Sequence, residues 1–462
     1  MSQLDNQAPP AGDVSWLAEH LFRQEAGKLV SVLTGIFGID RLQLAEDVVQ
    51  EALIRALQTW PYYGIPKNPA AWLTQTAKNL ALDLIRRETL FRHKQPDIVA
   101  AMEPGPASFD PGDGPLFDGE VKDGRLRLMF ACCHPLVPQD DQAALALKTL
   151  CGLGTGEIAK AFLTSEAAIA KRLTRARQRI REMRIPFEIP AGRELSHRLD
   201  GVLQTLYLLF NEGYKASSGA SLTRGELCRE AIRLTTLLVE HPQGDQPRAH
   251  ALLALMLLNA ARLGTRVDTE GNILRLKDQN RSRWDKGMIG LGMFHLNRSA
   301  AGKELSGYHI QAGIAACHSA APDYESTDWR RIVALYDRWM EMTDSPVVAL
   351  NRAVAVANLE GPGAGIEAVE AIKNRAQLES YYLLYAVLGE FKAQLNEPES
   401  AAADFREAIQ LTELKSEKSF LTKRLRECER RSRPVASRPP DTSAETIKTA
   451  RTSMDRVGAL PS

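Results

Sequence analysis

The chain has 462 residues, a formal net charge of +1 and 44% hydrophobic residues, an ordinary composition for a globular protein of several domains. It contains no run of eighteen apolar residues, and residues 1–12 are polar, so we expect neither a membrane span nor a secretion signal. Six cysteines form neither a disulfide framework nor paired zinc-binding spacing, which favours buried free thiols and a cytoplasmic protein.

Residues 14–95 have the apolar spacing of a compact helical unit. A helix is predicted over residues 45–57, with a buried stripe formed by Val49, Leu53, Ala56 and Leu57. Its outer face carries Glu46, Asp47, Gln50 and Glu51. A second helix is predicted over residues 71–87, with an apolar seam and a polar or basic face that includes Lys78, Asn79, Arg86 and Arg87. The unit therefore combines an acidic helix face with a basic one.

Residues 96–123 differ sharply from the segments on either side. They contain five prolines and several acidic residues, with no Lys or Arg before Lys122. This composition is typical of a flexible acidic linker.

Residues 142–184 are predicted to form three short helices separated by two breaks, the pattern of a helix-turn-helix. The first helix ends at Gly152, and Thr164 or Ser165 caps the third, which buries a face formed by Ile169, Leu173, Ala176 and Ile180. Nine Lys or Arg and three Glu give the stretch a net charge of +6. A basic helix in this setting fits the major groove of DNA. The alternative is a solvated basic helix.

The sequence Cys132-Cys133-His134-Pro135 precedes this stretch and raises the question of a metal or redox site. Adjacent cysteines orient poorly on one metal ion, and no second set of ligands stands nearby. We expect two buried thiols at the end of a helix, and no metal.

The segment from residue 190 to 430 shows helical periodicity and no comparable strand pattern, so the whole chain is predicted to be all-α. Near its end, small and aromatic residues occupy the positions of a tetratricopeptide repeat: Tyr385, Gly389, Phe391, Ala401, Phe405, Ala408 and Ile409. Residues 346–371 have the pattern of a degenerate earlier repeat. Residues 431–462 are rich in Arg, Pro, Ser and Thr and are predicted to be a disordered tail.

Chemistry-bearing residues in this C-terminal segment are scattered: Glu212, His295, His309, His318, Asp323 and Asp328. The glycines at 287, 290 and 292 follow no predicted strand, and residues 265–310 have the polar, Gly-interrupted composition of a loop. We expect no catalytic residues, no cofactor and no enzymatic activity. An α-helical enzyme with an appended DNA-binding unit is the competing interpretation.

Three segments in this order resemble the extracytoplasmic-function family of bacterial RNA polymerase sigma factors. They are AEDVVQEALIRAL, PAAWLTQTAKNLALDLIRR and GLGTGEIAKAFLTSEAAIAKRLTRARQRIRE. The resemblance implies an all-α fold with a region 2 domain at 14–95 and a region 4 helix-turn-helix domain at 124–185. The family's acidic linker runs close to polymerase channels, where residues 96–123 would act as a nucleic-acid mimic or as a simple spacer.

For region 2, the resemblance implies that Asp47, Gln50 and Glu51 dock on the clamp helices of the polymerase's largest subunit. The helix from residue 72 to 87 would face the −10 promoter element, with DNA contacts from Trp72, Asn79, Asp83, Arg86 and Arg87. Trp72 has two interpretations, a wedge between bases or a core residue.

For region 4, the resemblance implies recognition of the −35 element by the third helix. The residues expected to face the groove are Glu166, Ala167, Lys171, Arg172 and Arg175, and Arg177 and Arg179 are expected nearer the phosphates. The chain departs from the family pattern at Gly154 to Ala159, and at Ala170 and Lys171. A shift of one position turns a side chain by about 100° around the helix, which affects which side chains read bases.

The C-terminal segment resembles the extension of a sigma subgroup with tetratricopeptide-like helices. We expect the partners to be core RNA polymerase and promoter DNA, with a further protein partner or an intramolecular contact through the extension, and no membrane. The extension is predicted to regulate or support activity in cis. The alternative is a stand-alone helix-turn-helix regulator whose C-terminal helical domain senses a ligand or protein.

Overall fold

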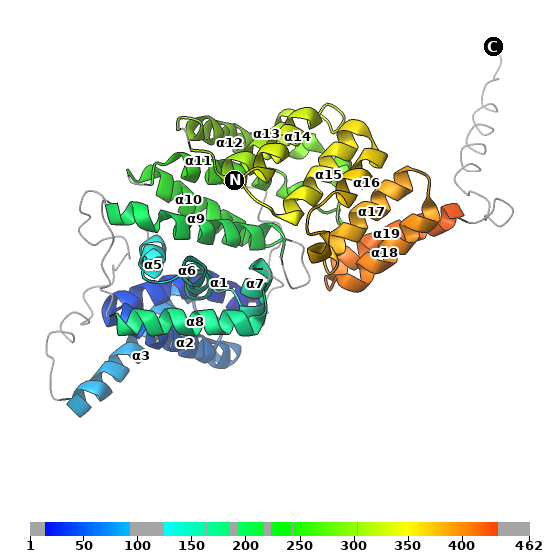
Figure 1. Cartoon of the computed structure of the whole chain (residues 1–462). Coiled ribbons are helices and arrows are strands. Elements are labelled where there is room, and N and C mark those ends of the chain that lie inside the picture. Colours follow the sequence, from blue (N-terminus) through cyan, green and yellow to red (C-terminus); the bar gives the residue numbers. More distant parts are fainter. Residues whose placement is uncertain are drawn as a thin grey trace, which may run out of the picture. The chain divides into compact units, whose positions relative to one another are not determined.

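The computed structural model describes residues 14–92, 124–162, 164–183, 193–216, 223–242, 244–302 and 304–432 (Figure 1). Every regular element in these ranges is helical, and the one β feature there is an isolated bridge between Val267 and Ile273. The predicted all-α fold is confirmed. The predicted linker at 96–123 lies outside the described residues, as does the predicted tail beyond Ser432.

The chain divides into two compact units, Met1–Trp339 and Met340–Ser462. Within the described ranges, no helix combines the length and apolar character that crossing a bilayer requires.

The first three helices of the first unit are α1 (Val14–Phe37), α2 (Leu42–Tyr63) and α3 (Pro69–Arg92), with the short 3-10 helix η1 (Ile39–Arg41) between α1 and α2. Gly38 ends α1 with a φ of 86°, a conformation that glycine adopts without a Cβ clash. The buried stripe of α2 includes Val49, Leu53 and Ala56 and continues to Trp60. Leu57 is 46% exposed, so its predicted burial is wrong: at this turn the core is reached from positions 56 and 60.

The next four helices are α5 (Gly124–Cys132), α6 (Gln139–Cys151), α7 (Thr155–Ala161) and α8 (Glu166–Glu182). Gly152 caps α6 in the left-handed region, and the Ser165 hydroxyl accepts a hydrogen bond from the Ala168 amide at the start of α8. The four apolar residues predicted to be buried in α8, at 169, 173, 176 and 180, are buried. The predicted helix-turn-helix breaks and caps are therefore confirmed.

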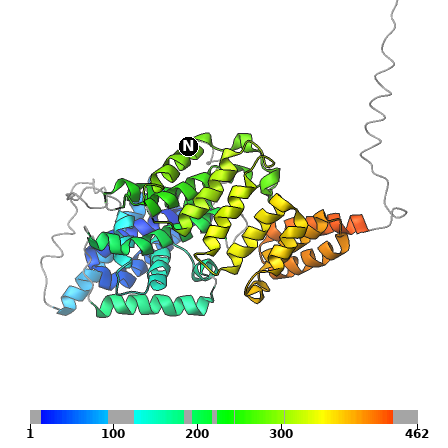
Figure 2. The same ribbon diagram turned by 45° about the horizontal axis from the view of Figure 1, so that its top comes forward.

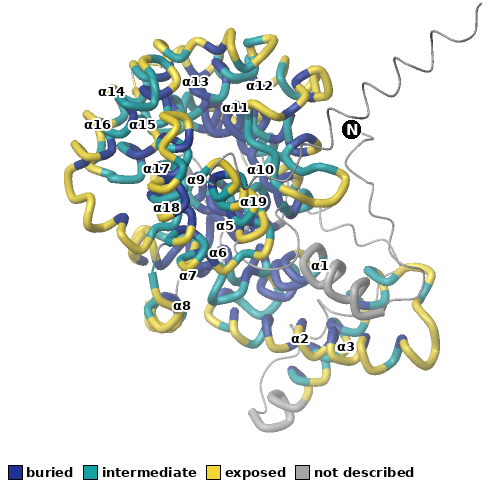
Figure 3. The backbone as a smooth tube through the Cα atoms, turned by 90° about the vertical axis from the view of Figure 1, so that its right-hand side faces the viewer, coloured by how far each residue is buried: buried dark blue, intermediate teal, exposed yellow. Residues whose placement is uncertain are grey.

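The rest of the first unit contains α9 (Arg193–Tyr214), α10 (Gly225–Glu240), α11 (Pro247–Ala260), α12 (Lys286–Ser299), α13 (Gly307–Ala320) and α14 (Trp329–Met340). Three 3-10 helices lie between α11 and α12: η2 (Leu263–Thr265), η3 (Leu276–Asp278) and η4 (Arg281–Arg283). Helix α11 is buried along almost its whole length, in the dark blue interior of Figure 3. It forms the centre on which α10, α12 and α13 pack.

Helix α12 contradicts the prediction of a loop across residues 265–310. A Cβ at Gly292 would lie 2.7 Å from the Cγ of Leu258, so this glycine allows α12 to approach α11 closely. Two of the clustered glycines, at 287 and 290, lie on the exposed side of the same helix. The glycine cluster therefore belongs to a helix–helix contact and its solvent face, and forms no phosphate loop.

The second unit consists of α15 (Pro346–Glu360), α16 (Pro362–Glu370), the 3-10 helix η5 (Arg375–Leu378), α17 (Tyr382–Gln394), α18 (Pro398–Leu411) and α19 (Lys415–Ser432). Its helices pack mainly on their neighbours in the chain: α15 on α16, α17 on α18, and α18 on α19. Gly389 contacts the ring of Phe405, so a small residue faces an aromatic one where α17 and α18 meet. The unit is thus built from successive helix pairs.

Candidate nucleic-acid and polymerase interfaces

Helix α8 forms one edge of the first unit and is visible along its whole length in Figure 2. Its apolar face is buried, and its first turn holds an acid where the helix dipole favours one, at Glu166. The predicted groove residues Glu166, Ala167, Lys171 and Arg175 are exposed, as is Arg179. Arg172 and Arg177 are half-buried. The helix thus presents cations on an accessible face, as a major-groove reader requires.

Two of these arginines are tied to α6. Arg175 donates to the buried carboxylate of Asp141 over 3.0 Å, and Arg172 lies 3.4 Å from Asp140 and over the ring of Phe162. Arg175 still has 63% of its side chain exposed, whereas Arg172 has 23%. Arg175 therefore retains more surface for a contact with DNA. That Arg172 and Arg175 contact bases in the groove stays a prediction.

Arg177 reaches across to region 2. Its guanidinium donates to Glu46 of α2 over 2.9 Å, and the Thr149 hydroxyl donates to the other oxygen of the same carboxylate over 2.6 Å. Glu46 is 8% exposed, so its predicted position on the acidic outer face is wrong. A buried carboxylate needs such partners, and here they come from more than a hundred residues further along the chain. A phosphate contact by Arg177 would compete with Glu46.

The acidic residues predicted to dock on polymerase lie together on α2. Asp47, Gln50 and Glu51 are all exposed, on one face of the helix. Two apolar side chains continue this face toward the C-terminus, Ile54 with 47% of its surface exposed and Leu57 with 46%. Sequence periodicity missed them as surface residues, because an apolar residue in an amphipathic helix is normally assigned to the core. The surface of α2 is therefore acidic at one end and apolar at the other.

Helix α3 carries the residues predicted to lie at the −10 element. Trp72 is partly buried and packs edge-on against Trp60, with 5.6 Å between the ring centroids. Asn79, Asp83 and Arg86 are exposed, and their spacing of four and three places them on one face. The side chain of Arg87 lies outside the described residues. The exposed residues form a contiguous polar strip, and Trp72 stands where that strip meets the core.

The Cys132-Cys133-His134 sequence ends α5, and both cysteines are buried as free thiols, as predicted. Burial raises the pKa of the Cys133 thiol to about 12, although nearby Arg198 opposes the shift. Across the part of the chain that the structure describes, no group of three or more His, Cys, Asp or Glu side chains is placed to hold a metal ion.

The extension is joined to region 4 through a buried arginine. Arg224, at the N-terminus of α10, lies 2.5 Å from Glu157 of α7 and 3.0 Å from Glu212 of α9. Glu157 also accepts the Gly154 amide at the start of α7 with its second oxygen. Glu212 is 4% exposed. The residue that caps α7, the second of the three helices in the helix-turn-helix stretch, is thus held by a guanidinium of the extension.

Two further contacts strengthen this junction. Arg125 of α5 pairs with Glu230 of α10 over 2.8 Å, and Arg198 of α9 donates to the Phe130 carbonyl of α5 over 3.3 Å. At Gly201 a Cβ would lie 2.5 Å from the side-chain oxygen of Gln142, so α9 and α6 touch closely. Sequence reasoning did not anticipate these contacts, because charged residues at helix surfaces carry no mark of a partner far along the chain.

Three family models match the chain. They are Sigma-70 region 2 over residues 21–90, Sigma-70 region 4 over residues 127–180, and a family of unknown function, DUF6596, over residues 198–300. The first two coincide with the bundle of α1 to α3 and with the helix-turn-helix domain. These two matches support an RNA polymerase sigma factor of the sigma-70 type. A stand-alone regulator would leave the region 2 match without a role.

The chain is also similar to three known proteins. The chain is 38% identical over 388 residues to an uncharacterised protein of Rhizobium meliloti (strain 1021), covering 83% of this chain and 90% of that protein. It is 32% identical over 139 residues to the probable RNA polymerase sigma factor RfaY of Xanthomonas campestris, covering 30% of this chain and 33% of that protein. It is 28% identical over 170 residues to the ECF RNA polymerase sigma factor SigE of Mycolicibacterium smegmatis, covering 36% of this chain and 61% of that protein.

The chain carries sigma-70 regions 2 and 4 and is similar over that part to ECF-type RNA polymerase sigma factors, which supports a role as an RNA polymerase sigma factor. Sigma factor families are not enzymes, consistent with the expectation of no catalytic activity. No solved structure matches the chain.

The exposed cations of α8 give a prediction for DNA affinity. Replacing Lys171 or Arg179 by Ala is expected to weaken binding of the full chain to duplex DNA and to lower the slope of log affinity against log salt by about one per residue, because each neutralised phosphate releases counterions. Fluorescence anisotropy at several salt concentrations measures the slope. An Arg283→Ala chain, changed at an exposed cation of η4, should keep the unaltered slope; equal slopes in all chains would contradict a phosphate role for these α8 residues.

Proposed function

We propose that this sigma factor reads promoters with two separate surfaces and that its C-terminal extension controls their use in cis. Asp47, Gln50 and Glu51, with neighbouring Ile54 and Leu57, dock on core polymerase. The outer face of α3 reads the −10 element, with Trp72, Asn79, Asp83, Arg86 and Arg87 as its contact residues. Helix α8 reads the −35 element from Glu166, Ala167, Lys171, Arg172 and Arg175, with Arg177 and Arg179 at phosphates.

The observation that carries the regulatory part of the proposal is the buried ion pair of Arg224 with Glu157 and Glu212. It ties the helix-turn-helix to α9 and α10 through charges that cannot separate without leaving a carboxylate buried. The extension therefore restrains the domain that would read the −35 element. The helix pairs of the second unit, which resemble tetratricopeptide repeats, would offer a surface for a further protein partner.

A second restraint lies within the sigma domains. The Glu46 carboxylate binds both Arg177 and Thr149, so regions 2 and 4 are packed on each other in this arrangement. The −10 and −35 elements lie apart on one duplex, and simultaneous recognition requires the two domains to separate. Opening the Glu46 contacts would free the Arg177 guanidinium for a phosphate. If core polymerase binds the separated state more tightly than the packed one, docking on polymerase would shift the equilibrium toward the separated state.

Truncation after Met183 tests the cis role. Promoter-specific transcription by core polymerase with the truncated chain is expected to differ from that with the full chain, since the restraint on region 4 is lost. Truncation also exposes the side of α5 and α6 that α9 covers, so an Arg224→Gln chain should be assayed alongside it. Unchanged promoter activity in both chains, with folding verified by circular dichroism, would remove the regulatory role.

A further inference from the structure

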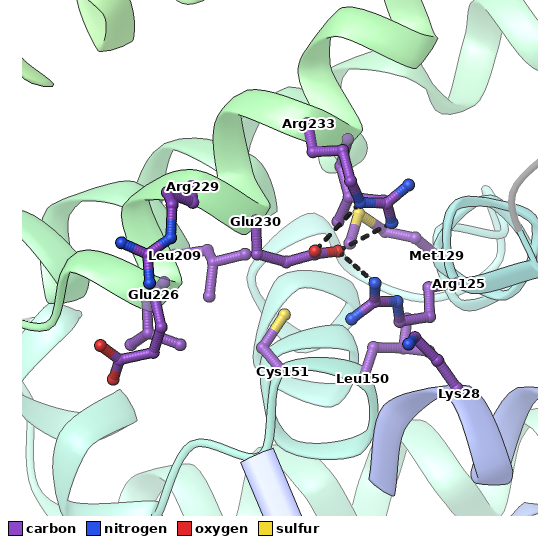
Figure 4. A pocket seen from close by; sticks show the side chains of 12 residues that line it. Lys28, Arg125, Met129, Leu150, Cys151, Leu209, Glu226, Arg229, Glu230 and Arg233 are labelled. Carbon is purple, nitrogen blue, oxygen red and sulfur yellow. Dashed lines mark hydrogen bonds and ion pairs between the residues drawn. The ribbon is translucent and has the colours of Figure 1, made fainter. Parts of the chain in front are cut away.

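A cavity of about 320 Å³ lies inside the first unit, where region 2, region 4 and the extension meet (Figure 4). Its lining comes from α1, α5, α6, α9 and α10. Cavities that hold small ligands span about 300–1,000 Å³, so this one suits a small molecule better than a peptide. Its lining includes none of the residues proposed to contact DNA or polymerase.

The floor of the cavity is apolar. It consists of buried side chains from four helices: Met129, Leu150, Cys151, Leu209, Leu227 and Leu234. Burial raises the pKa of the Cys151 thiol to about 12, and the carboxylate of Glu230 adds to the shift. Cys151 therefore remains a neutral thiol and acts as part of the apolar wall.

The rim of the cavity is charged. Lys28, Arg125, Arg229 and Arg233 line it together with the carboxylates of Glu226 and Glu230. Figure 4 shows Glu230 between Arg125 and Arg233, at 2.8 Å and 3.0 Å respectively. One carboxylate is thus shared by two guanidiniums, while Lys28 pairs with Glu25 at 3.0 Å. Two guanidiniums held this close together suit an anion, because guanidinium groups form strong charge-assisted hydrogen bonds with carboxylates and phosphates.

We propose that the cavity binds a small amphipathic anion, with its carboxylate or phosphate at the arginine rim and a short aliphatic body on the apolar floor. The anion would share the guanidiniums that Glu230 now occupies, and burial of its apolar part would add binding energy in proportion to the area removed from water. Binding depends only on the assembled cavity and not on the proposed regulatory role.

The position of the cavity means that ligand binding would affect how region 2, region 4 and the extension pack together. Its walls come from region 2, region 4 and the extension, so a ligand there binds the assembled arrangement better than one in which these parts have separated. Such a ligand stabilises the assembled arrangement by mass action. This consequence does rest on the proposed function, because it makes the ligand an inhibitor of promoter recognition.

Isothermal titration of the full chain with octanoate and with octyl phosphate tests the site, with octanamide as the neutral counterpart. Saturable binding of at least one anion at one site per chain is expected, and octanamide should bind at least about tenfold more weakly, the loss expected for one charge-assisted contact. Arg229→Gln and Arg233→Gln should each weaken the anion by about tenfold for the same reason. Both side chains are at the accessible rim, so the fold should persist.

Two further chains complete the test. Cys151→Leu places extra methyl groups in the cavity, toward which its side chain points in Figure 4, and should abolish binding without lowering the thermal midpoint. Arg283→Gln, at an exposed cation outside the cavity, should bind as the unaltered chain does. The proposal is overturned if neither anion binds, if octanamide binds equally well, or if the Arg229, Arg233 and Cys151 variants bind with full affinity. Promoter activity without ligand is a separate measurement that does not bear on the site.

Discussion

An Arg224→Met chain is expected to lose about 3–5 kcal/mol of unfolding free energy in its first unit, the cost typical of removing one partner of a buried ion pair. The guanidinium neutralises both Glu157 and Glu212, and the side chain of Glu212 is 3% exposed. Methionine fills much of the same volume, so the change removes charge with little loss of packing. Urea unfolding followed by circular dichroism measures the effect.

The matched control is Arg233→Met. Arg233 is also an arginine of α10 in an ion pair, with Glu230, but 42% of its side chain is exposed. Exposed pairs contribute at most about 1 kcal/mol, so this chain should unfold close to the unaltered one. Replacing Glu157 and Glu212 by Gln in the Arg224→Met chain should recover part of the loss. Equal urea midpoints for Arg224→Met and Arg233→Met would contradict the buried junction.

Reversing two charges on α2 is expected to weaken binding to core RNA polymerase by about 100-fold, because a docking surface of matched charge becomes repulsive. The chain is Asp47→Lys with Glu51→Lys, both at exposed positions, so its helical content and unfolding midpoint should stay unchanged. An Ile54→Asp chain should show a similar loss, since it places a charge in the apolar part of the same surface. Binding is measured by the shift of labelled core polymerase in a fluorescence titration.

A control with the same change in net charge separates docking from general electrostatics. Glu360→Lys with Glu370→Lys reverses two exposed acids in the second unit. This chain should bind core polymerase with nearly unaltered affinity. If the α2 and second-unit variants lose the same affinity, the α2 face has no specific role in docking.

The helix-turn-helix could be read from the sequence because its determinants are local. Ile169, Leu173, Ala176 and Ile180 recur at helical spacing, and Ser165 precedes them as a cap, so pattern and capping agree. The structure confirms both. The same reasoning identified the acidic residues of α2 that are exposed.

Glu46 shows where such reasoning fails. It stands among exposed acids, and only the arrival of Thr149 and Arg177 from distant helices makes its burial favourable. The prediction for Leu57 is wrong in the opposite sense. This apolar residue lies at the surface, because Ala56 and Trp60 are the residues that reach the core at this turn. Gly292 fits neither a loop nor a phosphate site, because its role is to admit Leu258 of another helix. Each of these outcomes is set by tertiary contacts that a linear pattern does not contain.

Transcription from a promoter template by core RNA polymerase, purified free of other sigma factors, measures the activity itself. With the full chain added, one discrete transcript with a defined 5′ end is expected, and it should disappear with the Asp47→Lys, Glu51→Lys chain. If the full chain binds the template yet yields no transcript above core polymerase alone, while a control sigma factor is active in the same preparation, the assignment as a sigma factor is contradicted.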